Sequence, residues 1–148
     1  MSILAINKRA SFDYEILERY EAGLVLSGEE VKSIKMAHIS LKGSFVTLHD
    51  NELYLTNATV SRYPYADPKK TYDPTRSRKL LVKRSQIRSF IGKIQVQGLT
   101  LVPLRVYTKK RYIKLEFALA KGKKAFDKRQ DIAKKEAKRS IERKMKGS

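Results

Sequence analysis

The sequence contains no cysteine and no tryptophan, and its only two histidines are His38 and His49. Without cysteine the chain cannot form a disulfide, a thiol nucleophile or a cysteine-ligated zinc site. A zinc site would need both isolated histidines together with carboxylates, so we expect each histidine at the surface or at a helix end. We therefore expect no catalytic residues, metal, cofactor or small-molecule substrate, and we interpret the chain as a binding protein.

Long apolar runs are also absent. The N-terminal segment has a four-residue apolar run, Ile3 to Ile6, before the charged residues begin. This run is too short for the hydrophobic region of a signal peptide, and no later run approaches the length of a membrane span. We therefore expect a cytosolic protein. A length of 148 residues allows one small domain with a single core, plus an extension.

Acidic residues are scarce relative to basic ones. The chain has 33 Lys and Arg residues against 15 Asp and Glu residues, which gives a net charge of +18 and a pI near 10.1. Such an excess attracts polyanions over long distances. Nucleic acid is the first partner that this charge indicates, and an anionic membrane surface is the second.

The first half of the sequence predicts a long strand, a short helix and a hairpin. Apolar residues from 12 to 26 predict a strand bent at Gly23. Ser27 and Glu30 form the pattern of a capping box, so we attribute the Glu29–Glu30 pair to a helix cap and a surface ion pair. The β-rich runs on either side of Asp50-Asn51 predict a hairpin, because both turn residues tolerate a positive φ.

The second half alternates between loop, helix and strand patterns. Three prolines predict an exposed loop over residues 62–79. A helix is expected from Ser85, as its cap, to Gly98, followed by a strand over residues 99–108 with Thr100, Val102, Leu104 and Val106 on one face and an edge or bulge at Pro103. Residues 112–119 alternate strictly, with Ile113, Leu115, Phe117 and Leu119 facing inward.

These elements predict a mainly β fold. One-faced strands with scattered helices favour a small antiparallel β-barrel with about three helices packed outside it. A split α+β sheet fits the same periodicity. We place the barrel domain at residues 1–120 and a basic C-terminal tail at residues 121–148.

The tail carries twelve Lys or Arg residues against four Asp or Glu residues, which is +8 of the total charge. Its apolar stripe is thin, with Ala133, Ala137, Ile141 and Met145 at helical spacing. So small a stripe does not offset the backbone entropy of folding, so we expect a tail that is disordered when free and helical on an anionic surface. A solvated tail that only aids solubility is the alternative.

The body of the chain also has residue types that bind RNA. Lys114 is expected to face outward from a strand, and the loop over residues 62–79 combines Arg residues with Tyr63, Tyr65 and Tyr72. Cations bind phosphates, and aromatic rings stack on bases. The alternative is that the tyrosines pack on the barrel and the arginines are solvated.

Several sequence blocks together resemble the SmpB family of SsrA-binding proteins. They recur in family order over essentially the whole chain, as Asn7-Lys8-Arg9-Ala10, Tyr14-Glu15-Ile16, Glu21-Ala22-Gly23-Leu24, Glu30-Val31-Lys32-Ser33, Asp73-Pro74-Thr75-Arg76, Arg78-Lys79-Leu80-Leu81, Gly98 to Leu104, Gly122-Lys123-Lys124 and Asp127-Lys128-Arg129. The resemblance implies an oligonucleotide-binding (OB)-like barrel. It also implies binding to the tRNA-like domain of transfer-messenger RNA (tmRNA, or SsrA) and delivery of that RNA to stalled ribosomes for trans-translation, with no membrane partner.

The resemblance also implies the site residues. The tmRNA-binding positions fall on Asn7, Lys8, Arg9, Glu21, Gly23, Arg76, Arg78, Lys79, Leu81 and Lys114. The positions expected to contact the ribosomal decoding centre and the empty mRNA channel fall on Gly122, Lys123, Lys124, Phe126, Asp127, Lys128, Arg129, Ile132, Ile141 and Met145. Many members of the family have tryptophan where this chain has Ala137, so the distal tail lacks that anchoring ring.

Two other functions fit the composition. A structural ribosomal protein or general RNA-binding protein would also combine a barrel with a basic tail. An RNA-processing enzyme is disfavoured because the sequence contains no cluster of acids or histidines.

Overall fold

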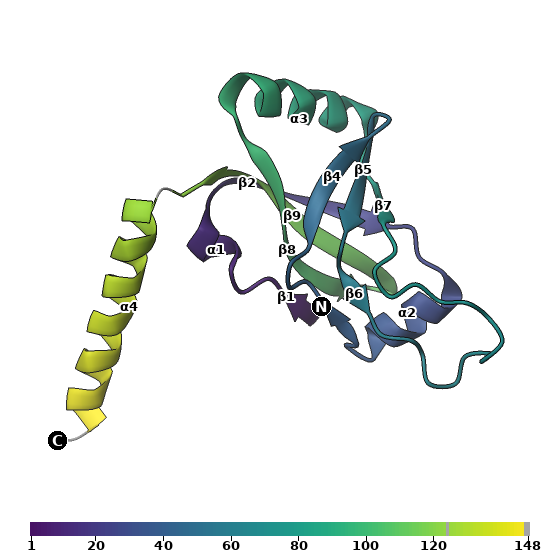
Figure 1. Cartoon of the computed structure of the whole chain (residues 1–148), viewed down its shortest axis with the longest axis horizontal. Helices are drawn as coiled ribbons and strands as arrows, with labels where there is room; N and C mark the ends of the chain where they lie inside the picture. The colour runs from purple at the N-terminus through teal and green to yellow at the C-terminus, as the bar shows by residue number, and fades with distance from the viewer. Residues whose placement is uncertain (124, 147–148) are drawn as a thin grey trace.

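The computed structural model in Figure 1 describes the backbone of residues 1–123 and 125–146, and the side chains of residues 1–123 and 128–140. The helices are α1 (Ala10–Asp13), α2 (Gly28–Lys35), α3 (Arg84–Gln97) and α4 (Ala125–Lys146). The strands are β1 (Ser2–Ile6), β2 (Tyr14–Leu24), β3 (Ile39–Ser40), β4 (Phe45–His49), β5 (Glu52–Thr56), β6 (Thr59–Val60), β7 (Arg78–Leu81), β8 (Thr100–Lys109) and β9 (Tyr112–Gly122).

Seven strands form one antiparallel sheet in the order β1-β8-β9-β2-β7-β5-β4, and β3 pairs with β6 in a separate small sheet. The large sheet curls, so that β4 at one end of this order contacts β8 near the other end. Within the described residues no strand pairing closes the curled sheet between β1 and β4. The structure confirms the mainly β, OB-like prediction, with the barrel left open and α1, α2 and α3 lying outside it (Figure 1).

The main core lies inside the curl of the sheet. The strict alternation in β9 is confirmed, because Ile113, Leu115, Phe117 and Leu119 all belong to this core. The helix α3 adds Phe90, whose ring centroid lies 4.6 Å from that of Tyr20 and 5.8 Å from that of Phe117. Edge-to-face ring packing of this kind adds to the free energy of burial and fixes α3 against the sheet.

A second, smaller apolar cluster lies on the outer face of the sheet, opposite the main core. It joins Ala10 of α1 to Val102 and Leu104 of β8 and to Ala118 and Ala120 of β9. The register of β8 against β9 shifts between Pro103 and Arg105, which is the predicted bulge. Because a bulge inserts one residue, β8 changes its inward face there. The expectation that Val102, Leu104 and Val106 share one face is therefore wrong, since Val106 belongs to the main core.

The helix α2 begins with the predicted capping box. The backbone N–H of Glu30 donates to Oγ of Ser27 (3.2 Å), and the backbone N–H of Ser27 donates to Oε1 of Glu30 (2.9 Å). The hairpin β4–β5 is also confirmed, with Asp50 and Asn51 at positive φ values of 49° and 61°. These short-range signals fix two elements beside the long central strands.

Three other elements differ from the prediction: α3 in its start, β1 in that it was not predicted, and β2 in the position of its irregularity. The helix α3 starts at Arg84, one residue before the predicted cap Ser85, and its N-cap is Lys83 without a side-chain hydrogen bond. Its predicted end is correct, because Gly98 is the C-cap at a φ of 64°. The strand β1 was not predicted, and the irregularity in β2 lies between Ile16 and Glu18 rather than at Gly23.

The tail forms one helix, α4, which extends away from the sheet in Figure 1. That the tail is disordered in the free protein stays a prediction. Nowhere in the described chain is there a helix with the length and apolar character needed to cross a membrane.

Candidate nucleic-acid interface

Lys114, Gly23 and Leu81 form a row across three neighbouring strands. Gly23 in β2 pairs with Lys114 of β9 on one side and with Leu81 of β7 on the other. Ala22 and Leu80 point into the main core, so the next residues along these strands, Gly23 and Leu81, face outward. Leu81 is 56% exposed. The sheet thus collects three of the predicted RNA-binding residues, from distant parts of the chain, on its outer face.

Gly23 leaves the middle of this row open. A Cβ atom at this position would lie 3.3 Å from Cδ1 and 3.4 Å from Cβ of Leu81. A hollow of about 340 Å³ lies over the row, and its lining includes Gly23, Leu81, Lys114, Val31 of α2 and the exposed ring of Tyr112. The absence of a side chain at Gly23 therefore gives Leu81 room to pack beside it and leaves the Gly23 backbone as part of the lining of the hollow.

Glu21 lies on the same face, two residues before Gly23. The hydroxyl of Tyr107 donates a hydrogen bond to Oε2 of Glu21, and Nζ of Lys109 lies 3.5 Å from its Oε1. The hydrogen bond from Tyr107 lowers the pKa of Glu21 below its ordinary value, with a smaller contribution from Lys109. The ionised carboxylate is an acceptor for the amino groups of bases or the 2′-hydroxyls of RNA.

The other acid on this face is paired with cations. Glu116 lies opposite Glu21 on β9, and its two oxygens bind Nη1 of Arg19 (3.2 Å) and Nη2 of Arg105 (3.1 Å). In the part of the chain with described side chains, Lys114 and Arg111 form no ion pair. The charge that remains available on this face for a polyanion is therefore positive.

Arg78 does not lie on the exposed surface. Its side chain is 1% exposed, and its Nε donates to Oε2 of Glu30 at 2.6 Å. Its other nitrogens donate to the carbonyl oxygens of Ala58 (2.8 Å) and Pro74 (3.0 Å). The expected direct contact between Arg78 and RNA is thus not available in this structure, because its nitrogens bind internal acceptors instead.

Glu30 is both the predicted cap residue and the buried partner of Arg78, while the ion pair expected for the Glu29–Glu30 pair is formed by Glu29 with Arg62. Burial alone would raise the pKa of Glu30, but hydrogen bonds from Arg76, the Ser27 backbone and Arg78 lower it below the ordinary value. Arg76 also binds Glu30, yet its side chain remains 44% exposed. Arg76 is therefore at the edge of this cluster, where part of it remains accessible.

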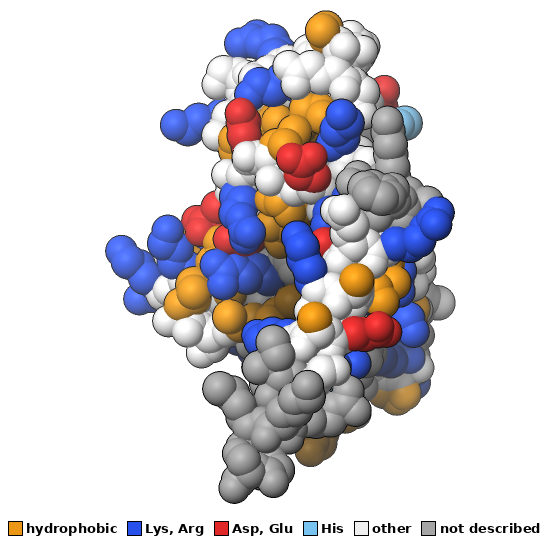
Figure 2. All heavy atoms as spheres, turned by 90° about the vertical axis from the view of Figure 1, so that its left-hand side faces the viewer, with side chains coloured by type: hydrophobic (Ala, Val, Ile, Leu, Met, Phe, Trp, Pro, Cys, Tyr) orange, Lys and Arg blue, Asp and Glu red, His pale blue; other side chains and the backbone are white. Residues whose placement is uncertain are grey.

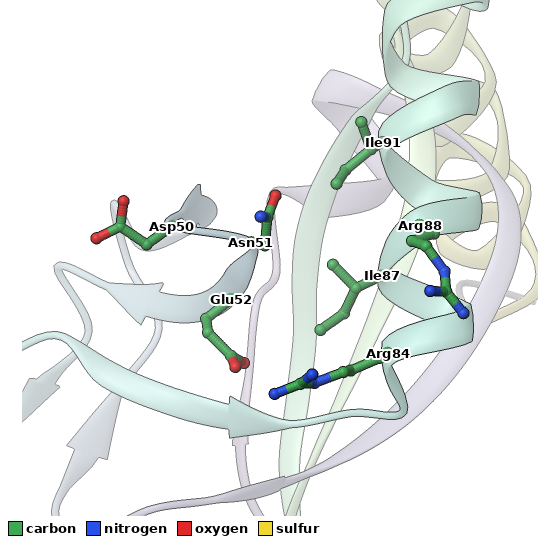
Figure 3. Close-up of a pocket in the computed structure, with 7 residues that line it drawn as sticks. All are labelled: Asp50, Asn51, Glu52, Arg84, Ile87, Arg88 and Ile91. Carbon is green, nitrogen blue, oxygen red and sulfur yellow. The ribbon is translucent and has the colours of Figure 1, made fainter.

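Lys79 lies two residues before Leu81 on β7 and close to Glu52, which lines a second hollow. Its Nζ is 3.7 Å from Oε1 of Glu52. Figure 3 shows the second hollow, of about 490 Å³, between the β4–β5 turn and α3, with the side chains of Arg84 and Glu52 extending toward each other. Arg84 and Arg88 line it and form no ion pair within the described residues. Sequence reasoning missed both arginines, because Arg88 was assigned only to a helix and Arg84 lies just before the predicted start of that helix.

The segment from Asn7 to Arg9 leads into α1. The side-chain amide of Asn7 donates to the carbonyl oxygen of Pro103 (2.8 Å), so this residue fixes the N-terminal segment to the bulge of β8. Lys8 and Arg9 are exposed. Arg9 Nε lies 3.3 Å from Oδ2 of Asp13, and its guanidinium carbon lies 5.0 Å from the ring centroid of Phe12.

The base of the tail contacts α1. Nζ of Lys123 donates to the carbonyl oxygen of Ser11 (2.8 Å), and Nζ of Lys128 lies 3.3 Å from Oδ1 of Asp13. Lys128 also lies 5.9 Å from the ring centroid of Phe12, on which Arg9 packs. The structure therefore brings Arg9 of the first predicted group together with Lys123 and Lys128 of the second at a single short helix.

The other predicted tail residues make fewer contacts. Gly122 ends β9 opposite Tyr14, and both Arg129 and Ile132 are exposed on α4. Five predicted positions cannot be placed, because Lys124 lies outside the described residues and so do the side chains of Phe126, Asp127, Ile141 and Met145. Figure 2 shows Lys and Arg side chains over much of the face on which α4 lies, with fewer Asp and Glu side chains among them.

The chemistry of the described residues is that of binding. Among them no group of three or more Asp, Glu or His side chains is arranged to hold a metal ion. His38 and His49 are both exposed, as expected. The outer face instead combines unpaired cations, an ionised acceptor, exposed aliphatic and aromatic surface and an open glycine, which together suit a folded RNA.

Comparisons with known proteins identify the family of the chain. The family model described as "SmpB protein" matches residues 4–147. The chain is 44% identical over 146 residues to an SsrA-binding protein of Thermosynechococcus vestitus, covering 99% of this chain and 96% of the relative. It is 48% identical over 145 residues to an SsrA-binding protein of Sulfurihydrogenibium sp., covering 98% and 95%.

A solved structure gives the same result. A chain in the structure described as "tmRNA-SmpB: a journey to the center of the bacterial ribosome" aligns with a TM-score of 0.64 and 46% sequence identity, covering 81% of this chain and 84% of that chain. The matching family model, the relatives and the shared fold all cover most of the sequence. The chain therefore belongs to the SmpB protein family.

Proposed function

We propose that this protein binds tmRNA through its sheet and carries it to stalled ribosomes for trans-translation. The observation that supports this most is the outer row of Lys114, Gly23 and Leu81, with Glu21 beside it. A cation, an open backbone, an exposed aliphatic group and an ionised acceptor from three strands suit a folded RNA loop better than a continuous phosphate track. The relatives are named SsrA-binding proteins, which favours tmRNA as that RNA.

The tail has a different role in this proposal. Residues 1–120 bind the tRNA-like domain of tmRNA, and residues 121–148 probe the decoding centre and the vacant mRNA channel. The helix α4 supports this division, because it is continuous over 22 residues and extends from the body rather than covering the sheet (Figure 1). Its charge suits an RNA-lined path. The protein acts in the cytosol as an adaptor that binds RNA without turnover.

The test is a deletion of residues 122–148. The truncated protein should bind a tmRNA fragment containing the tRNA-like domain with nearly unchanged affinity, but it should no longer support peptide tagging on ribosomes stalled at the end of a truncated message. A large loss of tmRNA affinity in the truncated protein would contradict the division between body and tail.

Stoichiometry on ribosomes separates the adaptor from a structural ribosomal protein. The adaptor should be substoichiometric on ribosomes and enriched on complexes stalled without a stop codon. A ribosomal protein would sediment one-to-one with all ribosomes, and degradation of RNA by the pure protein would indicate an enzyme instead.

A further inference from the structure

The loop between β6 and β7 contains three proline turns, of which the first two are consecutive. In the first, the backbone N–H of Ala66 donates to the carbonyl oxygen of Tyr63 (3.1 Å), with Pro64 and Tyr65 at the corner positions. In the second, the N–H of Lys70 donates to the carbonyl oxygen of Asp67 (3.2 Å). Pro64 and Pro68 occupy the same position in each turn, where the fixed φ of proline favours a β-turn.

Arg62, which directly precedes the first turn, binds the second turn through its side chain. Its Nη2 donates to the carbonyl oxygens of both Asp67 and Lys70, each at 2.7 Å. Its Nε lies 3.7 Å from Oε1 of Glu29, which ties the turns to α2. The loop therefore has a defined shape despite having no helix or strand, so a partner that binds it would not have to order it first.

The residue that follows proline is aromatic in the first of these turns and cationic in the second. In the first turn it is Tyr65, whose side chain is 82% exposed and whose ring lies 5.5 Å from that of Tyr63 at an interplanar angle of 68°. In the second turn it is Lys69, which is exposed and forms no ion pair within the described residues. The loop thus presents a ring with an open face and, one turn later, a free cation.

The surroundings favour an anionic partner such as RNA over a neutral or cationic surface. Residues 61–72 contain three Lys or Arg residues against one acid, Asp67, whose Oδ1 accepts the backbone N–H of Lys69 (3.0 Å). Lys32 of α2 places Nζ 5.4 Å from the ring centroid of Tyr63. The preceding residue, Val31, lines the hollow over Gly23 and Leu81, so the two turns flank the interface described above across α2.

We propose that these two turns form a second RNA-contact site, in which Tyr65 stacks on an unpaired base and Lys69 binds a neighbouring phosphate. Stacking needs an exposed ring, and the phosphate contact needs a cation near that ring; Tyr65 and Lys69 supply these groups from the same position of two consecutive turns. The proposal depends on the proposed function only for RNA as the partner. The RNA is either tmRNA or ribosomal RNA, since both present unpaired bases next to phosphates.

The test compares Tyr65→Ala with Tyr65→Phe in the full-length protein. Affinities are measured at one salt concentration for a tmRNA fragment containing the tRNA-like domain and, separately, for small ribosomal subunits. Tyr65→Ala should weaken binding to one of the two by about fivefold or more, which is the lower range for loss of one base stack. Tyr65→Phe should remain within about twofold of the wild type, because it keeps the ring.

Chemical probing of the affected RNA identifies the contact. A base that the wild-type protein protects should become reactive with Tyr65→Ala and protected again with Tyr65→Phe. Phe45→Ala serves as a matched control, because Phe45 is an exposed ring on β4, outside this loop. It should leave both affinities unchanged.

Three results would overturn the proposal: unchanged affinity of Tyr65→Ala for both RNAs, equal losses with Phe and Ala, or a loss without any newly reactive base. The last result would indicate a protein contact. Wild-type protein that bound no tmRNA would instead overturn the proposed function, so the two failures are distinct. The melting temperature of each variant confirms that the fold is retained.

Discussion

Tyr107 and Glu21 meet across a strand that contains neither of them. Tyr107 lies in β8 and Glu21 in β2, with β9 between them, and the hydroxyl of Tyr107 donates a hydrogen bond to the carboxylate of Glu21 over Lys114 and Glu116. Charge reasoning alone would not place an acid in an RNA site. The hydrogen bond explains how the acid is held ionised and oriented there.

Removal of this hydrogen bond should change the titration of Glu21. The hydrogen bond from Tyr107 lowers the pKa of Glu21 below 4.5, so the stability that it contributes is present above pH 4.5 and is lost as the pH falls through the lower folded value. In Tyr107→Phe the pKa of Glu21 should rise toward 4.5. NMR titration of the side-chain carboxyl carbons measures this change.

Tyr20→Phe is the control for that titration. The hydroxyl of Tyr20 donates to Glu18 rather than to Glu21. Its loss should raise the pKa of Glu18, which this hydrogen bond lowers, and leave that of Glu21 unchanged. Equal titration of Glu21 in the wild type and in Tyr107→Phe would show that the bond does not set its ionisation.

A side chain at Gly23 should impair RNA binding more than folding. Gly23→Val places its Cβ within 3.3 Å of Leu81 and fills the floor of the hollow. We expect affinity for tmRNA to fall by about tenfold, which corresponds to about 1.4 kcal/mol, while the melting temperature stays close to that of the wild type. Fluorescence anisotropy with a labelled tRNA-like fragment measures the affinity.

Gly92→Ala is the matched control. A Cβ at Gly92 meets no heavy atom within 4 Å, and this glycine lies inside α3. Alanine should stabilise the protein by about 0.5–1 kcal/mol, because glycine is unfavourable in a helix interior. RNA affinity should not change; a loss as large as that of Gly23→Val would show that the effect is not local to the hollow.

Lys114→Gln should change the salt dependence of binding. If Lys114 neutralises one phosphate, the slope of log affinity against log salt should become shallower by about 0.7 to 0.9. Lys42→Gln, at an exposed lysine outside the row of Lys114, Gly23 and Leu81, should leave the slope nearly unchanged. Binding measured at four or more salt concentrations tests this, and equal slopes for wild type and Lys114→Gln would exclude a phosphate contact.

Arg78 should be needed for stability. Arg78→Met leaves Glu30 buried without its internal partner, and loss of one member of a buried ion pair costs about 3–5 kcal/mol. Arg76→Met removes a half-exposed partner of the same carboxylate and should cost about 1 kcal/mol or less. Urea unfolding gives both values. If the two losses were equal, burial would not be what distinguishes the two arginines.

The elements predicted correctly are those whose signals are local. The alternation in β9, the capping box of Ser27 and Glu30 and the Asp50-Asn51 turn each depend on residues a few positions apart. The start of α3 at Arg84 was missed because its N-cap, Lys83, forms no side-chain hydrogen bond, whereas Ser85 is a residue type that favours the cap position. The strand β1 was missed because its partner, β8, lies about a hundred residues further along the chain.

The candidate site shows the same limit. Lys114, Gly23 and Leu81 were selected by family resemblance, and only the strand pairing shows that they are neighbours in the fold. Arg78 was assigned to the surface because its charge and its block suggested RNA binding, whereas its partner Glu30 lies 48 residues earlier in the sequence. The sequence alone did not distinguish Tyr65 from the other loop tyrosines. In the structure Tyr65 is exposed at the corner of a turn, whereas the hydroxyl of Tyr72 donates to the carbonyl oxygen of Val60.

The length of α4 limits how the protein can meet a ribosome. At 1.5 Å per residue, its 22 residues span about 33 Å, comparable to the diameter of a small domain. In the proposed function, the cations toward its far end would therefore lie away from RNA bound on the sheet and would need a separate anionic track of about that length. Such a tail would respond to the length of the track as well as to its charge, because a channel already filled by another strand offers no such track.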